Sequence, residues 1–247
     1  FQNFCQELGI KPTYLVDYAI ANNDTAANIL KGFNKSNCEI GAHLHPWANP
    51  PFYDETSDFS SHVINLPIEN VEAKLRALMD IIQDKIGITP KSFRTGRWGI
   101  NGPVLKLLTD VGIDTDSSIY PLYSNDYFSC EKANRSPYWP SFEDTNKVGK
   151  QNKIYEIPVT CGFNRSSTFW AQKFHRLMEQ RPFCWFRING LFWHTLLLRK
   201  IYLSPELCTA RDMNRLIDKC LKQKQTVFHM YLHSSSFLEQ ITGLNNE

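Results

Sequence analysis

Short apolar runs of strand length alternate with segments of helical periodicity along most of this chain. The runs predicted as strands lie at residues 11–17, 39–45, 92–94, up to Asp116, 154–159 and 227–233. Strands separated by helices of this length favour a parallel sheet with right-handed crossovers. The sequence therefore predicts an α/β fold, in which the sheet is either closed into a barrel or left open.

The predicted helices have recognisable ends. Apolar residues recur at helical spacing from residue 71 to residue 86, and Gly87 follows them as a stop signal. Thr209 and Asp212 are spaced like a capping pair in front of the last helix. The chain opens inside a helix over residues 1–8 that has no cap before it. We therefore expect that the chain is cut from a longer sequence and that a strand precedes it.

The composition is that of a folded globular protein. Of the 247 residues, 42% are hydrophobic and 21% are charged, and this length suits one sizeable core. We predict a single domain over residues 1–247, with a long ordered loop around 122–153 and a variable segment around 163–203. The net charge of +2, without a dense Lys and Arg cluster between aromatic residues, argues against a nucleic-acid partner.

Two further features bear on membranes and compartment. The most apolar run, residues 191–203, is interrupted by His194, Arg199 and Lys200, so it is too short to span a bilayer and is expected to be a packed or interfacial helix. The seven cysteines form no CxxC pair and, being odd in number, cannot all pair with one another. Free thiols favour a reducing compartment such as the cytoplasm. The sequence determines neither the localisation nor the oligomeric state.

The strongest chemical signal is His43-Leu44-His45-Pro46 at the end of a predicted strand. Residues two apart on a strand point to the same side, so the two imidazoles should converge. Neutral imidazole is a common ligand of divalent metals, and a catalytic zinc takes about three protein ligands plus water. The alternative is that one histidine packs and the other hydrogen-bonds in a loop. Asp17 is a reserve carboxylate ligand, although an Asp at a strand end is more often a turn residue or helix cap.

Other ionisable residues also fall where predicted strands end. His233 follows the last apolar run, where α/β barrels carry catalytic groups, and is a candidate general acid. His229 lies four residues earlier and is expected to be a core histidine. Arg94 can orient a carboxylate there, and Asp116 can hold an imidazole in one tautomer. A surface ion pair is the alternative for each of the last two.

Several segments occur in the order seen in a known family. They are Gly9-Ile10-Lys11-Pro12-Thr13-Tyr14-Leu15, Glu39-Ile40-Gly41-Ala42-His43, Phe93-Arg94, Asp116-Ser117-Ser118 and His233-Ser234. With them the chain resembles the polysaccharide deacetylases of the NodB homology type, carbohydrate esterase family 4, and most of all the sub-group with Phe-Arg-Thr-Gly-Arg-Trp-Gly at the third motif. The match runs to about Phe237, and residues 122–203 match poorly apart from Glu156-Ile157-Pro158.

The resemblance implies a fold and a set of roles. The fold would be a distorted (β/α) barrel of the NodB, or glycoside hydrolase/deacetylase, type that is incomplete at the N-terminus. His43 and His45 would hold a divalent metal, expected to be zinc. Arg94 would orient a catalytic aspartate, and His233 would act as the acid with Asp116 tuning it. The family's aspartate pair lies on a strand upstream of residue 9, so this chain by itself is expected to be inactive.

The implied reaction is hydrolysis of the acetamide group of an N-acetylated sugar or polysaccharide. Metal-activated water would attack the carbonyl, and His233 would protonate the departing amine. Trp47, Arg97 and Trp98 are expected to contact the carbohydrate substrate. Trp47, Trp98 and Tyr120 can stack on sugar rings, although aromatic residues in such places are at least as often simple packing.

Two other functions fit the same residues. An amidohydrolase-type metal hydrolase also uses a pair of histidines two apart, but it would normally carry an Asp on the last strand, where this chain has His233. A non-catalytic carbohydrate-binding relative would keep the barrel and the aromatic residues and lack the base. Two acidic residues at the end of an upstream strand would favour catalysis over binding.

Overall fold

The structure is a computed structural model and describes residues 1–33, 37–53, 55–165, 168–181, 183–195 and 197–237. Its contacts divide the chain into two compact units, Phe1–Ile157 and Pro158–Glu247. The single domain over residues 1–247 stays a prediction.

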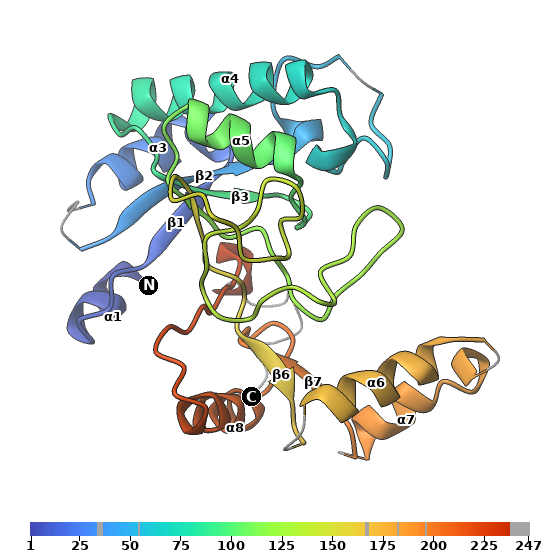
Figure 1. Cartoon of the computed structure of the whole chain (residues 1–247). Coiled ribbons are helices and arrows are strands. Elements are labelled where there is room, and N and C mark those ends of the chain that lie inside the picture. Colours follow the sequence, from blue (N-terminus) through green and yellow to red (C-terminus); the bar gives the residue numbers. More distant parts are fainter. Residues whose placement is uncertain (34–36, 54, 166–167, 182, 196, 238–247) are drawn as a thin grey trace. The chain divides into compact units, whose positions relative to one another are not determined.

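A five-stranded parallel sheet forms the centre of the first unit (Figure 1). Its strands follow the order of the sequence: β1 Thr13–Val16, β2 Glu39–Leu44, β3 Ser92–Thr95, β4 Thr115–Asp116 and β5 Tyr155–Glu156. Each neighbouring pair is parallel, which confirms the predicted α/β class. The described strands form an open sheet, so closure into a barrel stays a prediction.

Side-chain caps begin several helices of the first unit. Its helices are α1 Gln2–Glu7, α2 Tyr18–Asn22, α3 Asp24–Lys31, α4 Ile68–Ile86 and α5 Gly102–Asp110. The Asp17 carboxylate accepts a hydrogen bond from the backbone N–H of Ile20 at 2.8 Å, so this residue caps α2. The sequence allows Asp17 to be a reserve metal ligand or a helix cap, and the structure confirms that it is a helix cap. Asn23 and Asn101 cap α3 and α5 in the same way.

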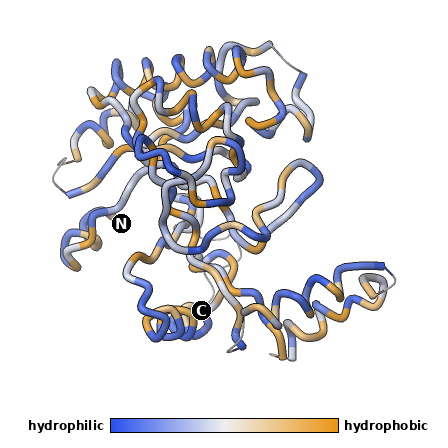
Figure 2. The backbone as a smooth tube through the Cα atoms, in the orientation of Figure 1, coloured by the Kyte–Doolittle hydropathy of each residue, from blue (hydrophilic) through white to orange (hydrophobic). Residues whose placement is uncertain are grey.

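The helix α4 supplies much of the core of the first unit. Together with α5 it covers the sheet, and blue and orange positions alternate along it in Figure 2. Leu75, Leu78 and Ile82 are fully buried and pack in one cluster with Phe93 of β3. The helix ends at Gly87, whose φ of 79° lies in the left-handed region that a helix stop uses. This helix and its end are as the sequence predicts.

Residues 122–153 form the long ordered loop that the sequence predicts. Their described contacts are isolated bridges, such as Tyr138 with Glu156, rather than complete strands or helices. The Tyr138 hydroxyl donates to the Thr145 carbonyl at 2.6 Å, and both residues are buried. Hydrogen bonds within the loop and buried tyrosine therefore order it without regular secondary structure.

The described residues of the second unit form a small antiparallel sheet, three α-helices and two short 3-10 helices. The strands and α-helices are β6 Cys161–Phe163, α6 Thr168–Glu179, α7 Ile188–His194, β7 Lys200–Tyr202 and α8 Ala210–Lys222. Thr209 caps α8 by accepting from the backbone N–H of Asp212 at 3.2 Å, which confirms the predicted capping pair. The Asp212 carboxylate also accepts from the Arg199 guanidinium at 2.7 Å and so ties the helix to the residue before β7.

The predicted strand at residues 227–233 is wrong, because these residues have no strand assignment. The backbone N–H of His229 donates to the Thr160 hydroxyl at 2.8 Å, and that of Tyr231 donates to the Leu203 carbonyl at 3.2 Å. A side-chain hydroxyl thus takes the place of a backbone carbonyl, which interrupts the ladder. His229 is half-buried and not the fully buried core residue that was expected.

The helix predicted over residues 191–203 is wrong for the second part of this run: α7 ends at His194, whereas Lys200–Tyr202 form the strand β7 because they pair with β6. Across the described ranges, none of the helices combines the length and apolar character needed to cross a bilayer. The cysteines at 5, 38, 130, 161, 208 and 220 are buried thiols.

Candidate functional site

The ends of β2 and β3 bring the two predicted imidazoles together in the first unit. His43 lies in β2, and His45 follows its last residue. Their ring centroids are 4.5 Å apart, with the planes at 79°. Gly96, just after β3, allows this arrangement, because a Cβ at that position would overlap the His45 ring. The convergence expected from the alternation of a strand is therefore present.

One hydrogen bond orients the His43 ring. Its Nδ1 lies 3.0 Å from the carbonyl oxygen of Arg94, which can only accept, so Nδ1 carries the hydrogen. The lone pair is then on Nε2, the tautomer in which a histidine with such a backbone partner binds a metal. Among the described residues, however, no group of three or more His, Cys, Asp or Glu side chains could hold a metal ion. The pair supplies two of the roughly three protein ligands of a catalytic zinc.

Arg94 is held on an aromatic stack beside the histidines. It pairs with His43 in the register of β2 and β3, and its guanidinium lies 4.8 Å from the centre of the Trp98 ring. Trp98 stacks on Tyr120 with centroids 4.6 Å apart. The Nε of Arg94 also donates to the carbonyl and hydroxyl of Ser117, each at 3.3 Å. Trp98 has a φ of 58°, a strained conformation for a bulky residue, of a kind that clusters at functional sites.

Trp47 and Arg97 extend the same surface. The Trp47 ring lies 4.5 Å from the His45 ring, and the Arg97 guanidinium lies 5.5 Å from the centre of Trp47. Arg97 also makes a long ion pair of 3.5 Å with Asp58, and both side chains are largely exposed. The structure thus groups most of the predicted site residues at one edge of the sheet: His43, His45, Trp47, Arg94, Arg97 and Trp98.

A buried lysine that the sequence analysis missed holds the loop carrying Trp47. Lys74 lies on α4 and is 2% exposed. Its ammonium group donates to the carbonyl oxygens of Pro46, Asn49 and Pro51 at 3.1, 3.0 and 2.6 Å. The three carbonyl oxygens replace the water molecules that the ammonium group loses on burial. A lysine on the apolar face of a predicted helix is the signal that could have identified this role.

Asp116 is fully buried in β4, in register with the fully buried Glu156 of β5. The Ser118 hydroxyl donates to Oδ1 of Asp116 at 2.7 Å, and the backbone N–H of Ile119 donates to Oε1 of Glu156 at 3.2 Å. Burial raises the pKa of both carboxyls, and the neighbouring Asp116 charge raises that of Glu156 further. Oδ2 of Asp116 and Oε2 of Glu156 are buried without a hydrogen-bond partner among the described residues, and protonation of either carboxyl would remove a buried charge. In the sequence, Glu156 is marked by its place in an apolar strand and by the Glu156-Ile157-Pro158 segment noted above, but neither identifies Asp116 as its partner.

His233 belongs to the second unit, where its carboxylate partner is Glu206. The His233 Nδ1 lies 2.9 Å from Oε2 of Glu206, and the Ser236 hydroxyl also donates to this carboxylate. Burial acts to raise the Glu206 pKa, but the hydrogen bonds from Ser236 and His233 outweigh it, so the pKa is lowered. The tuning of His233 by Asp116 stays a prediction, and the sequence analysis did not identify Glu206.

No protein-family model matches this sequence, and no curated protein matches it. Two solved structures show a partial likeness. One is assigned as a polysaccharide deacetylase from Mycobacterium smegmatis, with 18% identity and a TM-score of 0.45, covering 64% of this chain and 43% of that one. The other is assigned as a glycoside hydrolase/deacetylase from Parabacteroides distasonis, with 13% identity and a TM-score of 0.40, covering 60% of this chain and 44% of that one.

The chain therefore spans less than half the length of either structure.

Proposed function

We propose that this protein is a hydrolase that removes acetyl groups from N-acetylated carbohydrate. The observation that carries the proposal is the grouping of His43 and His45 with the stack of Arg94 on Trp98 at the end of β2 and β3. Aromatic faces beside polar groups suit the apolar faces and hydroxyls of a sugar ring. Two imidazoles beside that surface suit either a metal or proton transfer.

In this proposal the residues of the first unit bind and orient the substrate. Trp47 and Trp98 would contact the sugar, and Arg94 would orient a carboxylate or hold a substrate oxygen. His43 and His45 would contribute two ligands to a divalent metal, zinc by expectation, and a complete centre would need at least one more. When bound, such a metal would polarise the acetamide carbonyl and activate water.

His233 keeps its predicted role as a general acid in the proposal. The Glu206 carboxylate, 2.9 Å from its Nδ1, would stabilise the protonated imidazole and leave Nε2 to deliver the proton to the departing amine. Glu206 is then a positioning residue, because it would act through His233.

A second candidate function is carbohydrate binding without catalysis. The described residues supply an aromatic surface but only two metal ligands, which is what a binding protein derived from a deacetylase would retain. The two candidates differ in whether acetate is released.

The test uses the protein at its natural length, with an oligomer of N-acetylglucosamine as substrate. We expect about one metal ion per chain and release of acetate. Combined His43→Ala and His45→Ala substitutions should abolish both, because they remove two ligands. His194→Ala, an exposed histidine of α7, is the matched control and should change neither.

The other outcomes decide between the candidates. Binding of the oligomer with no acetate and no metal, even after zinc is supplied, would reject the hydrolase and support the binding protein. If the protein neither binds the oligomer nor releases acetate, a carbohydrate function for this surface is rejected.

A further inference from the structure

Residues 165–200 form a strongly basic segment of this protein. This segment has seven Lys or Arg residues and a single acidic residue, Glu179, which gives it a net charge of +6, whereas the whole chain has +2. The segment contains α6 and α7 with a short 3-10 helix, Phe183–Phe186, between them, and α6 contacts both. We refer to it as the hairpin. The net charge of the whole chain does not reveal this basic segment, because the remaining residues are net acidic.

The hairpin also exposes large apolar side chains. Phe169 and Trp170 of α6 are 68% and 64% exposed, and Trp185 and Phe186 of the 3-10 helix are 71% and 72% exposed. Leu177 of α6 and Leu191 of α7 are exposed as well. Trp170, Phe174 and Leu177 follow the i, i+4, i+7 spacing, so they form one stripe along α6. An apolar patch of this kind is uncommon on a protein surface unless something covers it.

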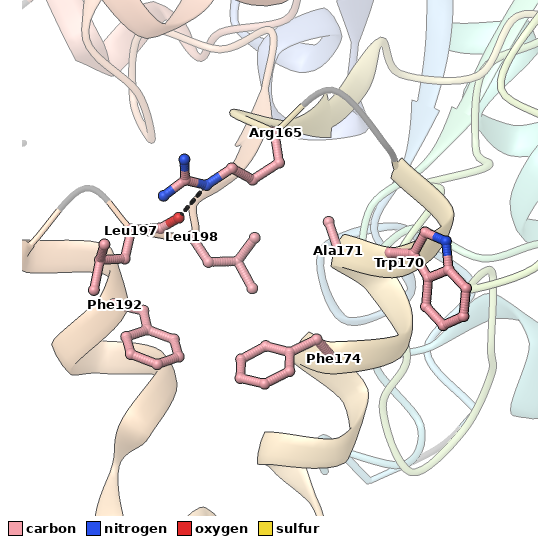
Figure 3. A pocket seen from close by; sticks show the side chains of 7 residues that line it. All are labelled: Arg165, Trp170, Ala171, Phe174, Phe192, Leu197 and Leu198. Atoms are coloured by element: carbon pink, nitrogen blue, oxygen red, sulfur yellow. Dashed lines mark hydrogen bonds between the residues drawn. The ribbon is translucent and has the colours of Figure 1, made fainter.

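Cations lie at the edge of these apolar side chains. The Lys173 ammonium is 5.3 Å from the centre of the Trp170 ring. In Figure 3 the Arg165 side chain lies at one side of an open cavity of about 320 Å³, and Leu198 projects toward the cavity. Phe174 and Phe192 face each other across the cavity with ring centroids 5.7 Å apart. Glu179 is the only acidic residue in the sequence of the hairpin, and its Oε1 lies 3.2 Å from Nδ1 of His175.

We propose that the hairpin docks on an anionic lipid bilayer. Trp and Phe side chains would enter the region between headgroups and acyl chains, while the exposed Lys173, Arg181 and Arg187 would contact lipid phosphates. The cavity beside Arg165 offers space for part of an acyl chain next to a cation. This inference is independent of the proposed function, and it places a peripheral contact on a chain whose described helices are too short or too polar to span a membrane.

Charge and side-chain type favour a bilayer over other occupants. A second copy of the hairpin would bring two surfaces of net charge +6 together, which like-charge repulsion opposes. Single-stranded nucleic acid would match the charge and stack on aromatic rings, but it would not cover the exposed leucines with an apolar surface. An anionic bilayer satisfies the aromatic rings, the leucines and the cations at once.

The test is sedimentation of the full chain with vesicles. We expect binding to vesicles of phosphatidylcholine with roughly one quarter phosphatidylglycerol, and at least about tenfold weaker binding to phosphatidylcholine alone. Phe186→Ser should weaken binding to the anionic vesicles about tenfold, because it removes an inserted ring. Arg181→Glu should weaken it by a similar factor and make the remaining binding less sensitive to salt.

Two matched controls and two competing outcomes complete the test. Phe4→Ser removes a ring of α1 that is 58% exposed, and Lys31→Glu reverses an exposed charge of α3; neither should change vesicle binding. Circular dichroism of Phe186→Ser should match that of the parent. Equal binding to both vesicle types, no binding, or binding that Phe186→Ser leaves intact overturns the proposal. Two further results would also overturn it when vesicle binding is absent. One is a dimer in ultracentrifugation that Phe186→Ser abolishes, and the other is binding of a single-stranded oligonucleotide that Phe186→Ser abolishes.

Discussion

The two units of this protein place similar side chains in opposite environments. On α4 the apolar stripe is buried, and Leu75 and Leu78 have no exposed surface. On α6 a stripe with the same helical spacing leaves Trp170 and Phe174 64% and 41% exposed. Hydrophobic periodicity therefore predicts that a helix has an apolar side, but it does not predict what covers that side.

The ionisable groups of the two units show the same contrast. Asp116 and Glu156 are fully buried beside each other in the first unit, and burial raises the pKa of both. Glu206 of the second unit is paired with the largely exposed His233, and its pKa is lowered. In this protein, burial thus raises the pKa of a carboxyl group, whereas hydrogen-bond donors and a nearby imidazole lower it.

The largest expected effect comes from truncating the apolar stripes. Leu78→Ala should lower the free energy of unfolding by about 2 to 5 kcal/mol, because it leaves a cavity in a closely packed core. Leu177→Ala on α6 is the matched change and should cost less than about 0.5 kcal/mol, since that side chain is already 44% exposed. Urea unfolding measures both. Equal losses would show that the α6 stripe is covered in solution.

An intermediate effect is expected from the buried carboxyl pair. A carboxyl whose pKa is raised on folding contributes stability below its ordinary pKa of about 4, and this stability is lost as the pH rises. Glu156→Gln removes one titrating group and keeps the shape. The variant should therefore be more stable than the parent by about 1 to 2 kcal/mol at pH about 7, and this advantage should disappear near pH about 4.

Urea unfolding at the two pH values measures this difference. Glu156→Ala is the control, because it leaves a cavity beside Asp116 and should destabilise the first unit at both pH values. If Glu156→Gln shifts stability by the same amount at both pH values, the raised pKa of Glu156 does not contribute to the pH dependence of stability.

The smallest effect is expected at Glu206. Its lowered pKa means that it contributes stability above its ordinary pKa, about 4.3, and that this contribution is lost as the pH falls through the folded value. Glu206→Gln should cost less than about 1 kcal/mol at neutral pH, because the His233 partner is 66% exposed and water screens the pair. The difference from the parent should vanish near pH about 3. A constant difference across the range would assign it to packing instead.

Much of the first unit could be predicted from short stretches of sequence. The α4 periodicity with its Gly87 stop depends on neighbours within a few residues. In the second unit the same is true of the capping of α8 by Thr209. The convergence of His43 and His45 follows from the alternation of one strand. The strand expected at residues 227–233 failed because a ladder needs partners, and Thr160 supplies a hydroxyl to His229 in place of a carbonyl.

The sequence by itself determined the α/β class, the helix ends and the paired histidines, since each depends on interactions within one helix or strand. Only the tertiary structure decided that Glu156 faces Asp116, that Lys74 holds the loop of Trp47 and that Glu206 binds His233. These partners are between 27 and 40 residues apart in the sequence. The physical reason is that burial and charge pairing depend on which distant segments meet, whereas capping and periodicity depend on the local backbone.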